Sequence, residues 1–254
     1  MTVLPGAEPF SHDGGEVGVL LCHGFTGSPQ SLRPWAEGLA AAGHTVRLPR
    51  LPGHGTTWRE LNTTSFDQWF GCVDDAFREL RTRCPVVLVG GLSMGGALAL
   101  RLAQRHGDQI AGLVLVNPAV KAQDPRLAAV PLLKYLLQST PGIGSDIKRA
   151  GATELAYDRT PLKALHSMLQ GWKSVVADLG RVTQPVLIFR SPQDHVVPAS
   201  STELIRQRIG SSDVTEVLCE DSYHVATLDN DADQILTGSL DFILRVTAAD
   251  RSAS

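Results

Sequence analysis

Residues 86–106 read VVLVGGLSMGGALALRLAQRH, an apolar run that leads through a glycine-rich turn into a helical pattern. The apolar run predicts a buried strand, and residues 95–106 predict a helix. Between them stands Gly91-Leu92-Ser93-Met94-Gly95, a G-x-S-x-G sequence. Alone such a pentapeptide says little, but between a strand and a helix it is typical of a turn that presents a nucleophilic serine. The alternative is a small-residue turn that only packs closely.

Sterics explain the two glycines of this turn. A strand that turns so sharply into a helix forces Ser93 into a strained backbone conformation, and side chains at positions 91 and 95 would clash. The serine hydroxyl is then exposed at a helix N-terminus, where the helix dipole and the free amides favour a developing anion. We therefore predict Ser93 as a nucleophile.

The rest of the chain alternates apolar runs with amphipathic stretches. This alternation is typical of a mainly parallel sheet flanked by helices, and it predicts the α/β fold class. Strands are predicted at 17–21, 45–48, 86–89, 110–116, 186–189 and 214–218, and helices at 30–42, 65–80, 95–106 and 233–246. In the second helix apolar residues recur at steps of three and four, with Ser65 as the predicted N-cap.

Residues 119–182 break this rhythm. They contain no clear strand, and helical fragments are predicted at 127–137, 152–157 and 162–179. The stretch is too long for a plain crossover, and such insertions in compact domains are usually functional lids. The pattern favours a small helical cap at 119–182, inserted into a core of residues 1–118 and 183–254. One irregular crossover helix with long loops is the alternative.

A serine nucleophile needs a base and an orienting acid, which in this kind of fold follow it in the order acid, then histidine. His224 lies after the last predicted strand and before the last helix, where the base is expected; a surface loop histidine is the alternative. Asp194 follows the strand at 186–189 and is the predicted acid, unless it is an ordinary turn residue. Asp221 and Asp229 are rivals, but both are close in sequence to His224.

Cys22-His23-Gly24-Phe25-Thr26-Gly27 follows the first predicted strand. A tight turn here can aim the amide of Phe25 at the same point as the amide of Met94, which predicts an oxyanion hole. We expect His23 to be a structural hydrogen-bonding residue beside this hole. Gly53-His54-Gly55 is a second tight turn and is expected to be scaffold.

Composition limits the function classes. The 254 residues, 43% of them hydrophobic, predict one large domain. A net charge of −3 argues against a nucleic-acid partner. The four scattered cysteines indicate free thiols in a reducing compartment. With no apparent signal peptide or membrane span, we expect a soluble, cytoplasmic protein. Neither a phosphate-binding loop nor metal-ligand spacing is present, so no cofactor and no metal are expected.

The order HGFTG, GLSMG, DHVVP and SYHVATLD resembles the bacterial, Bacillus-type monoacylglycerol lipase and carboxylesterase family of α/β-hydrolases. GAEPF, RLPGHGT, IGSD and ELAYDRTP extend the resemblance over nearly the full length. It implies an α/β-hydrolase fold, a triad of Ser93, Asp194 and His224, and oxyanion donors at Phe25 and Met94.

The resemblance also implies a cap over a pocket for a single acyl chain. In the family a cap glutamate recognises the glycerol hydroxyls; the matching position is Glu154, with Ile143 near the pocket. From the residues alone, leucines of the cap (Leu127, Leu132, Leu133, Leu136 and Leu137) can line an acyl channel together with Val196, Phe25 and Met94. The alternative is that the leucines only pack the cap and that Glu154 is solvated. Residues 121–140 resemble the family less, which leaves acyl length open.

These observations predict a serine ester hydrolase that cleaves monoacylglycerols through an acyl-enzyme on Ser93. Its partners are a small lipid ester and, transiently, lipid surfaces, and we expect a monomer or homodimer. A carboxylesterase or thioesterase acting on short- to medium-chain acyl esters is the main alternative. A ligand-binding protein on the same scaffold or a cofactor-free haloperoxidase is more remote, and a dehalogenase would need aspartate at position 93.

Overall fold

The computed structural model describes residues 2–142 and 144–253. Its centre is a seven-stranded sheet with the order β1-β3-β2-β4-β5-β8-β9. The strands are β1 (Phe10–His12), β2 (Val17–Cys22), β3 (Thr45–Leu48), β4 (Val86–Leu92), β5 (Gly112–Val116), β8 (Val186–Arg190) and β9 (Val214–Leu218). β1 pairs antiparallel with β3, and all other neighbours are parallel. The predicted fold class and the six predicted strands are confirmed; β1 was not predicted.

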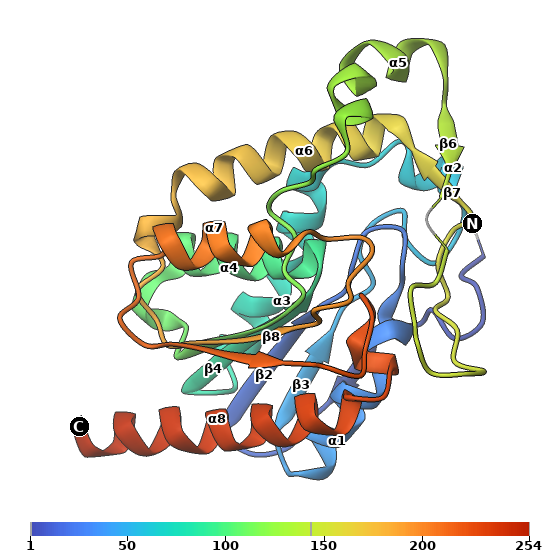
Figure 1. Cartoon of the computed structure of the whole chain (residues 1–254). Helices are drawn as coiled ribbons and strands as arrows, with labels where there is room; N and C mark the ends of the chain where they lie inside the picture. The colour runs from blue at the N-terminus through green and yellow to red at the C-terminus, as the bar shows by residue number, and fades with distance from the viewer. Residues whose placement is uncertain (1, 143, 254) are drawn as a thin grey trace.

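Helices cover both faces of the sheet (Figure 1). α1 (Arg33–Ala41) and α8 (Ala232–Ala253) pack on one face, and α3 (Phe66–Arg81), α4 (Met94–His106), α6 (Leu162–Ala177) and α7 (Ala199–Arg208) on the other. Successive strand residues point to opposite faces, so β5 sends Leu113 and Leu115 into one core and Val114 and Val116 into the other. Burial on both faces explains why the central strands β2, β4 and β5 are continuously apolar.

The predicted helix at 65–80 is confirmed as α3, and its start shows why it forms there. The Ser65 side chain accepts a hydrogen bond from the Gln68 amide, and the Gln68 side chain accepts one from the Ser65 amide. This capping box satisfies two amide groups that the first turn leaves unpaired. The predicted stripe is buried against the sheet: Phe66, Trp69, Val73, Phe77 and Leu80.

We call residues 117–185, between β5 and β8, the inserted segment. It contains α5 (Val130–Leu136), α6 and an antiparallel pair of short strands, β6 (Ser139–Pro141) and β7 (Arg159–Pro161). α6 packs against α3 and α4, whereas α5 lies at the outer end of the molecule (Figure 1). Sequence analysis found no strand here, so the β6–β7 pair is an addition. The division into a core and a cap at 119–182 stays a prediction.

The helix predicted at 152–157 is wrong. The amide of Leu155 donates to the Gln30 side chain at 2.9 Å, and the amide of Tyr157 donates to the carbonyl of Thr26 at 3.1 Å. These backbone groups bond to a distant part of the chain, which outweighs the weak local preference of six residues for a helix.

Shorter elements complete the described chain. They are the helix α2 (Trp58–Leu61) and the 3-10 turns Pro29–Leu32, Gly107–Gln109, Pro125–Ala129, Leu179–Arg181 and Ala226–Leu228. Within residues 2–142 and 144–253, no helix combines the length and the apolar character needed to cross a membrane.

Candidate active site

Ser93 stands at the turn between β4 and α4, with φ +55° and ψ −120°. This is a strained region for a residue with a side chain, and such strain costs on the order of 1–3 kcal/mol. The Ser93 amide donates to the carbonyl of Val116 on β5 at 3.0 Å, which holds the turn in place. The Ser93 hydroxyl makes no capping bond to α4.

The steric argument for the two glycines is confirmed. A Cβ atom at Gly91 would lie 2.3 Å from the carbonyl of Gly95, and one at Gly95 would lie 1.8 Å from the carbonyl oxygen of Cys22. Both obstacles are backbone atoms, which cannot move aside as a flexible side chain can. The sharp turn therefore requires glycine at both positions.

Asp194 and His224 lie together at the carboxyl ends of the strands. Oδ2 of Asp194 is 2.8 Å from Nδ1 of His224, and both side chains are more than nine-tenths buried. The other oxygen, Oδ1, accepts hydrogen bonds from the amides of Val196 and Val197 at 2.8 and 2.7 Å. Because the carboxylate accepts a hydrogen bond from the Nδ1–H group, Nε2 of His224 is left as the basic nitrogen.

Charge around His224 favours its protonated form. Burial by itself would lower the pKa of His224, but the hydrogen bond to Asp194 and the charges of Asp194, Glu154 and Asp146 outweigh it, and the pKa is raised above its ordinary value. In the described chain no hydrogen bond joins Ser93 to His224. Such contacts are often long in free enzymes and close when substrate binds.

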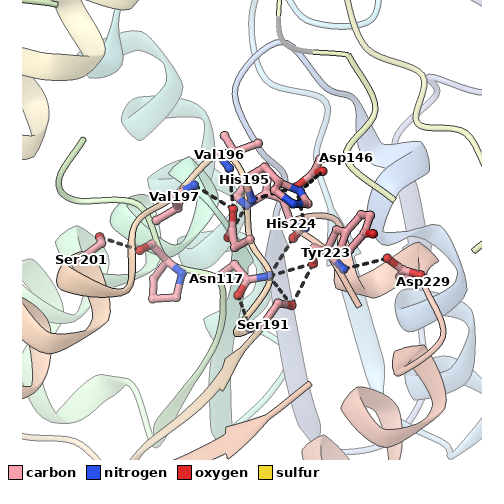
Figure 2. A network of polar contacts seen from close by, with 12 residues as sticks. Asn117, Asp146, Ser191, His195, Val196, Val197, Ser201, Tyr223, His224 and Asp229 are labelled. Atoms are coloured by element: carbon pink, nitrogen blue, oxygen red, sulfur yellow. Dashed lines mark hydrogen bonds and ion pairs between the residues drawn. The ribbon is translucent and has the colours of Figure 1, made fainter. Parts of the chain in front are cut away.

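We call the loop between β8 and α7, which carries Asp194, the acid loop, and the loop between β9 and α8, which carries His224, the base loop. Asn117, which directly follows β5, connects the two (Figure 2). Its side-chain nitrogen donates to the Ser191 hydroxyl at 3.0 Å and to the carbonyl of His224 at 2.8 Å, and its oxygen accepts the Ser191 amide at 2.8 Å. The Ser191 hydroxyl in turn donates to the carbonyl of Tyr223 at 2.8 Å. Sequence reasoning missed both residues, although each immediately follows an apolar strand at the edge where the site lies.

The two rival acids have other partners. The Asp229 carboxylate accepts the amides of Tyr223 and Lys148 at 2.9 and 2.7 Å, and Asp221 pairs with the Lys148 ammonium at 2.7 Å. Neither is hydrogen-bonded to the His224 ring in the part of the chain described. Geometry therefore favours Asp194 over both.

The turn with Phe25 lies against Ser93, because a Cβ at Gly24 would be 3.6 Å from the Cβ of Ser93. Across the described residues, the amides of Phe25 and Met94 donate to no other protein group. Two free amides beside Ser93 fit the predicted oxyanion hole, and their role stays a prediction.

His23 has the structural role expected of it. Its Nδ1 hydrogen-bonds the carbonyl of Gly24 at 2.9 Å, and its Nε2 accepts the Leu51 amide at 3.2 Å. Full burial lowers the pKa of His23 to about 4, so the ring is neutral near pH 7. His54 is also fully buried and packs edge-on against His23 and Trp69, and Trp69 contacts Phe25. The rings of His54 and Trp69 therefore pack against the Phe25 side chain and support the turn that carries it.

Glu154 also reaches this region. Its Oε1 lies 2.6 Å from where a Cβ at Gly27 would stand, beside the Phe25 turn. Burial raises the pKa of Glu154 to about 7, although the nearby His224 charge acts to lower it. The residue as a whole is partly buried, so its role and the alternative of a solvated carboxylate both stay predictions.

The backbone on both sides of Glu154 is held by one side chain. Gln30 donates through Nε2 to the carbonyl of Thr153 at 3.0 Å and accepts the amide of Leu155 through Oε1 at 2.9 Å. The Glu154 amide itself donates to the Ser145 hydroxyl at 3.0 Å. No local pattern in the sequence indicates these hydrogen bonds of Gln30.

The remaining predicted site residues have different outcomes. Ile143 lies outside the described residues. Val196 is partly buried and packs against the same core as Phe25 and Met94. Among the leucines, Leu127 and Leu133 pack on this core, but Leu132, Leu136 and Leu137 are 75%, 80% and 49% exposed. The expectation that all five line a channel is therefore wrong, because a short surface helix can turn only one face inward.

Outside the undescribed positions 1, 143 and 254, the structure contains no group of three or more His, Cys, Asp or Glu side chains that could hold a metal ion.

Comparison with known proteins places these features in a family. The family described as "Serine aminopeptidase, S33" matches residues 16–231. The thermostable monoacylglycerol lipase of Bacillus sp. (strain H-257) is 45% identical, over 96% of each chain. The carboxylesterase of Bacillus subtilis (strain 168) is 25% identical, over 93% of this chain and 96% of its own.

Solved structures agree with this placement. One from work on two metagenome-derived lipolytic enzymes, LipS and LipT, has a TM-score of 0.93 and 46% identity, and the match covers 96% of this chain and 100% of that one. The monoacylglycerol lipase of Paleococcus ferrophilus shares the fold at a TM-score of 0.78 and 20% identity, over 97% of this chain and 100% of its own. The chain therefore belongs to the family described as "Serine aminopeptidase, S33", and it is a serine ester hydrolase with the α/β-hydrolase fold.

Proposed function

We propose that this chain hydrolyses monoacylglycerols to glycerol and a fatty acid through an acyl-enzyme on Ser93. The observation that carries the proposal is the buried Asp194–His224 pair at 2.8 Å, together with the strained backbone of Ser93, whose hydroxyl makes no capping bond to α4. The 45% identity to a monoacylglycerol lipase over almost the whole chain supports the choice of substrate.

The proposed mechanism gives each of these groups one role. The Ser93 hydroxyl attacks the ester carbonyl while Nε2 of His224 takes its proton, and Asp194 stabilises the imidazolium that forms. The amides of Phe25 and Met94 hold the oxyanion; one such donor contributes about 2.7–4 kcal/mol in related sites. His224 then protonates the departing glycerol, and it later activates the water that releases the fatty acid.

Glu154 supports glycerol as the leaving group. A monoacylglycerol carries two free hydroxyls, and the two oxygens of one carboxylate can accept a hydrogen bond from each. The Gln30 clamp fixes the backbone around Glu154, and burial makes an unpaired carboxylate costly there. Hydroxyl donors from the substrate would remove that cost.

The first test is the variant Ser93→Ala, which we expect to abolish turnover without altering the far-UV circular dichroism. Rates near those of the unaltered enzyme would contradict the assignment of Ser93. The second test compares a monoacylglycerol with the methyl ester of the same fatty acid, in the unaltered enzyme and in Glu154→Gln. A selective loss on the monoacylglycerol supports glycerol recognition.

The carboxylesterase and thioesterase alternatives share the same triad. They predict equal rates on the two esters, or higher rates on short p-nitrophenyl esters and acyl thioesters. Because the matching family is described as an aminopeptidase, the substrate panel also includes an amino-acid p-nitroanilide. Hydrolysis of this anilide in preference to all esters would overturn the lipase proposal.

We further propose that residues 119–182 act as a cap whose outer helix touches lipid surfaces. Three large side chains of α5, namely Leu132, Tyr135 and Leu136, are 75–80% exposed, and Lys134 lies beside the Tyr135 ring. Leucine, aromatic and basic side chains together are typical of helices that lie in a membrane interface. When both Leu132 and Leu136 are replaced by serine, we expect a smaller fraction of the protein to sediment together with phosphatidylcholine vesicles. Leu244→Ser, on α8, is the matched control.

A cytoplasmic location is also proposed. Cys22, Cys84 and Cys219 are buried free thiols, a use of cysteine that is usual in reducing compartments. After cell fractionation, the chain should appear with cytosolic markers; recovery from an oxidising compartment would contradict this location.

A further inference from the structure

Asp146, in the inserted segment, places its carboxylate between the acid loop and the base loop (Figure 2). Its Oδ1 lies 2.8 Å from Nδ1 of His195, the residue after Asp194. Its Oδ2 accepts two backbone amides, from His195 at 3.2 Å and from His224 at 3.1 Å. Only 13% of the Asp146 side chain is exposed. One largely buried carboxylate thus contacts both loops of the proposed triad.

The backbone around Asp146 strengthens this connection. The carbonyl of Asp146 accepts a hydrogen bond from the amide of Val225 at 3.1 Å. Two adjacent residues of the base loop, His224 and Val225, therefore both donate an amide hydrogen bond to Asp146. In the opposite direction, the Asp229 carboxylate accepts the amides of Lys148 and Arg149 at 2.7 and 2.8 Å. The base loop therefore rests on residues 146–149 as well as on the sheet.

We propose that Asp146 is a positioning residue for His224: by joining the amides of His195 and His224, it holds the imidazole at the angle that faces Ser93. The inference rests on the proposed function, in which Ser93, Asp194 and His224 perform the chemistry. A displacement of about 1 Å in such a site can lower the rate on the order of a hundredfold. Without Asp146 the partly buried His224 amide would also lose its acceptor.

The backbone contacts, rather than the ion pair, carry this role. The His195 side chain is 61% exposed, so water screens its attraction to Asp146. The groups that face the His195 ring are Asp146 and the ring of Tyr223, at a centroid distance of 4.6 Å. The charged groups acting on His224 are Asp194, Glu154 and Asp146, so removal of Asp146 leaves two carboxylates in place.

The experiment uses Asp146→Ala, Asp146→Asn and His195→Ala, with Asp158→Asn as the control. Asp158 is an exposed acid of the same segment, and no hydrogen bond of its side chain is seen in the described structure. With a short p-nitrophenyl ester, we expect Asp146→Ala to lower kcat at least about tenfold while KM changes little. Asp146→Asn keeps one oxygen for the two amides, so its loss should be smaller. His195→Ala and Asp158→Asn should resemble the unaltered enzyme.

A pH profile separates positioning from general loss of structure. The negative charge of Asp146 raises the pKa of His224, so the acid limb of kcat/KM should move to lower pH in Asp146→Asn and stay in place in Asp158→Asn. The monoacylglycerol to methyl ester rate ratio should not change, in contrast to Glu154→Gln.

Three outcomes would overturn the inference. They are an unaltered kcat in folded Asp146→Ala, a loss in His195→Ala as large as in Asp146→Ala, and an unshifted acid limb with unaltered kcat in Asp146→Asn. If Asp146→Ala does not fold, the result for Asp146→Asn tests the inference alone. Turnover by Ser93→Ala would instead refute the proposed function itself, so the two failures remain distinguishable.

Discussion

Nδ1 of His224 lies 2.8 Å from Oδ2 of Asp194, while Oδ1 of the same carboxylate is occupied by the amides of Val196 and Val197. Only one oxygen therefore faces the imidazole, and its orientation is fixed by the backbone. In such an arrangement the carboxylate selects one tautomer of the histidine, and a neutral amide in its place can select the other.

Asp194→Asn tests this relationship. The side-chain oxygen of asparagine should take the two backbone amides, so its NH2 group would face His224 and favour the tautomer with the proton on Nε2. We expect kcat to fall on the order of 10⁴-fold with a normal fold, as in related triads. Asp221→Asn, at the rejected rival acid, should keep nearly full activity. Comparable losses in both variants would contradict the assignment of the acid.

A pair of glycine substitutions tests the steric basis of the nucleophile turn. Gly95→Ala would place a Cβ 1.8 Å from the carbonyl oxygen of Cys22, whereas a Cβ at Gly71 in α3 meets nothing within 4 Å. In urea unfolding we expect Gly95→Ala to destabilise the fold by more than about 2 kcal/mol and to lose activity. Gly71→Ala should stabilise it by roughly 0.5–1 kcal/mol, because glycine is unfavourable inside a helix. A mild effect at Gly95 would show that the turn can relax.

Gln30→Ala tests whether the clamp around Glu154 serves specificity. The substitution removes two hydrogen bonds that hold the backbone of Thr153 and Leu155. We expect kcat/KM for a monoacylglycerol to fall several-fold, roughly the effect of 1 kcal/mol, with little change for the methyl ester. Gln207→Ala, an exposed residue of α7, provides the same change without such contacts. Equal losses on both esters would assign Gln30 a purely structural role.

The predictable part of this molecule is the part determined by neighbouring residues. The turn at Ser93 follows from steric limits between Gly91 and Gly95, and the start of α3 follows from Ser65 and Gln68. The positions of Asp194 and His224 follow from the order of strands in a parallel sheet, since the loops at one edge converge.

Long-range hydrogen bonds account for what sequence analysis missed. Asn117 bonds to Ser191, 74 residues away, Asp146 bonds to the amide of His224, 78 residues away, and Gln30 bonds to Leu155, 125 residues away. Each is a polar residue whose partner no local pattern can indicate. The false helix at 152–157 has the same origin, because the amides of Leu155 and Tyr157 bond to Gln30 and Thr26, partners that only the folded chain supplies.

Glu154→Gln should change how stability depends on pH. Burial raises the pKa of Glu154 from 4.5 to about 7, so ionisation of this carboxyl opposes folding. The cost is absent below the unfolded pKa, grows as pH rises from about 4.5, and is complete above about 7. At about 1.36 kcal/mol for each pKa unit, its upper limit is about 3 kcal/mol. Tm measured at pH 5 should therefore be similar in the two proteins, whereas at pH 8 Glu154→Gln should be the more stable. A Tm difference that does not vary with pH would mean that the carboxylate is well solvated and would weaken its proposed contact with glycerol.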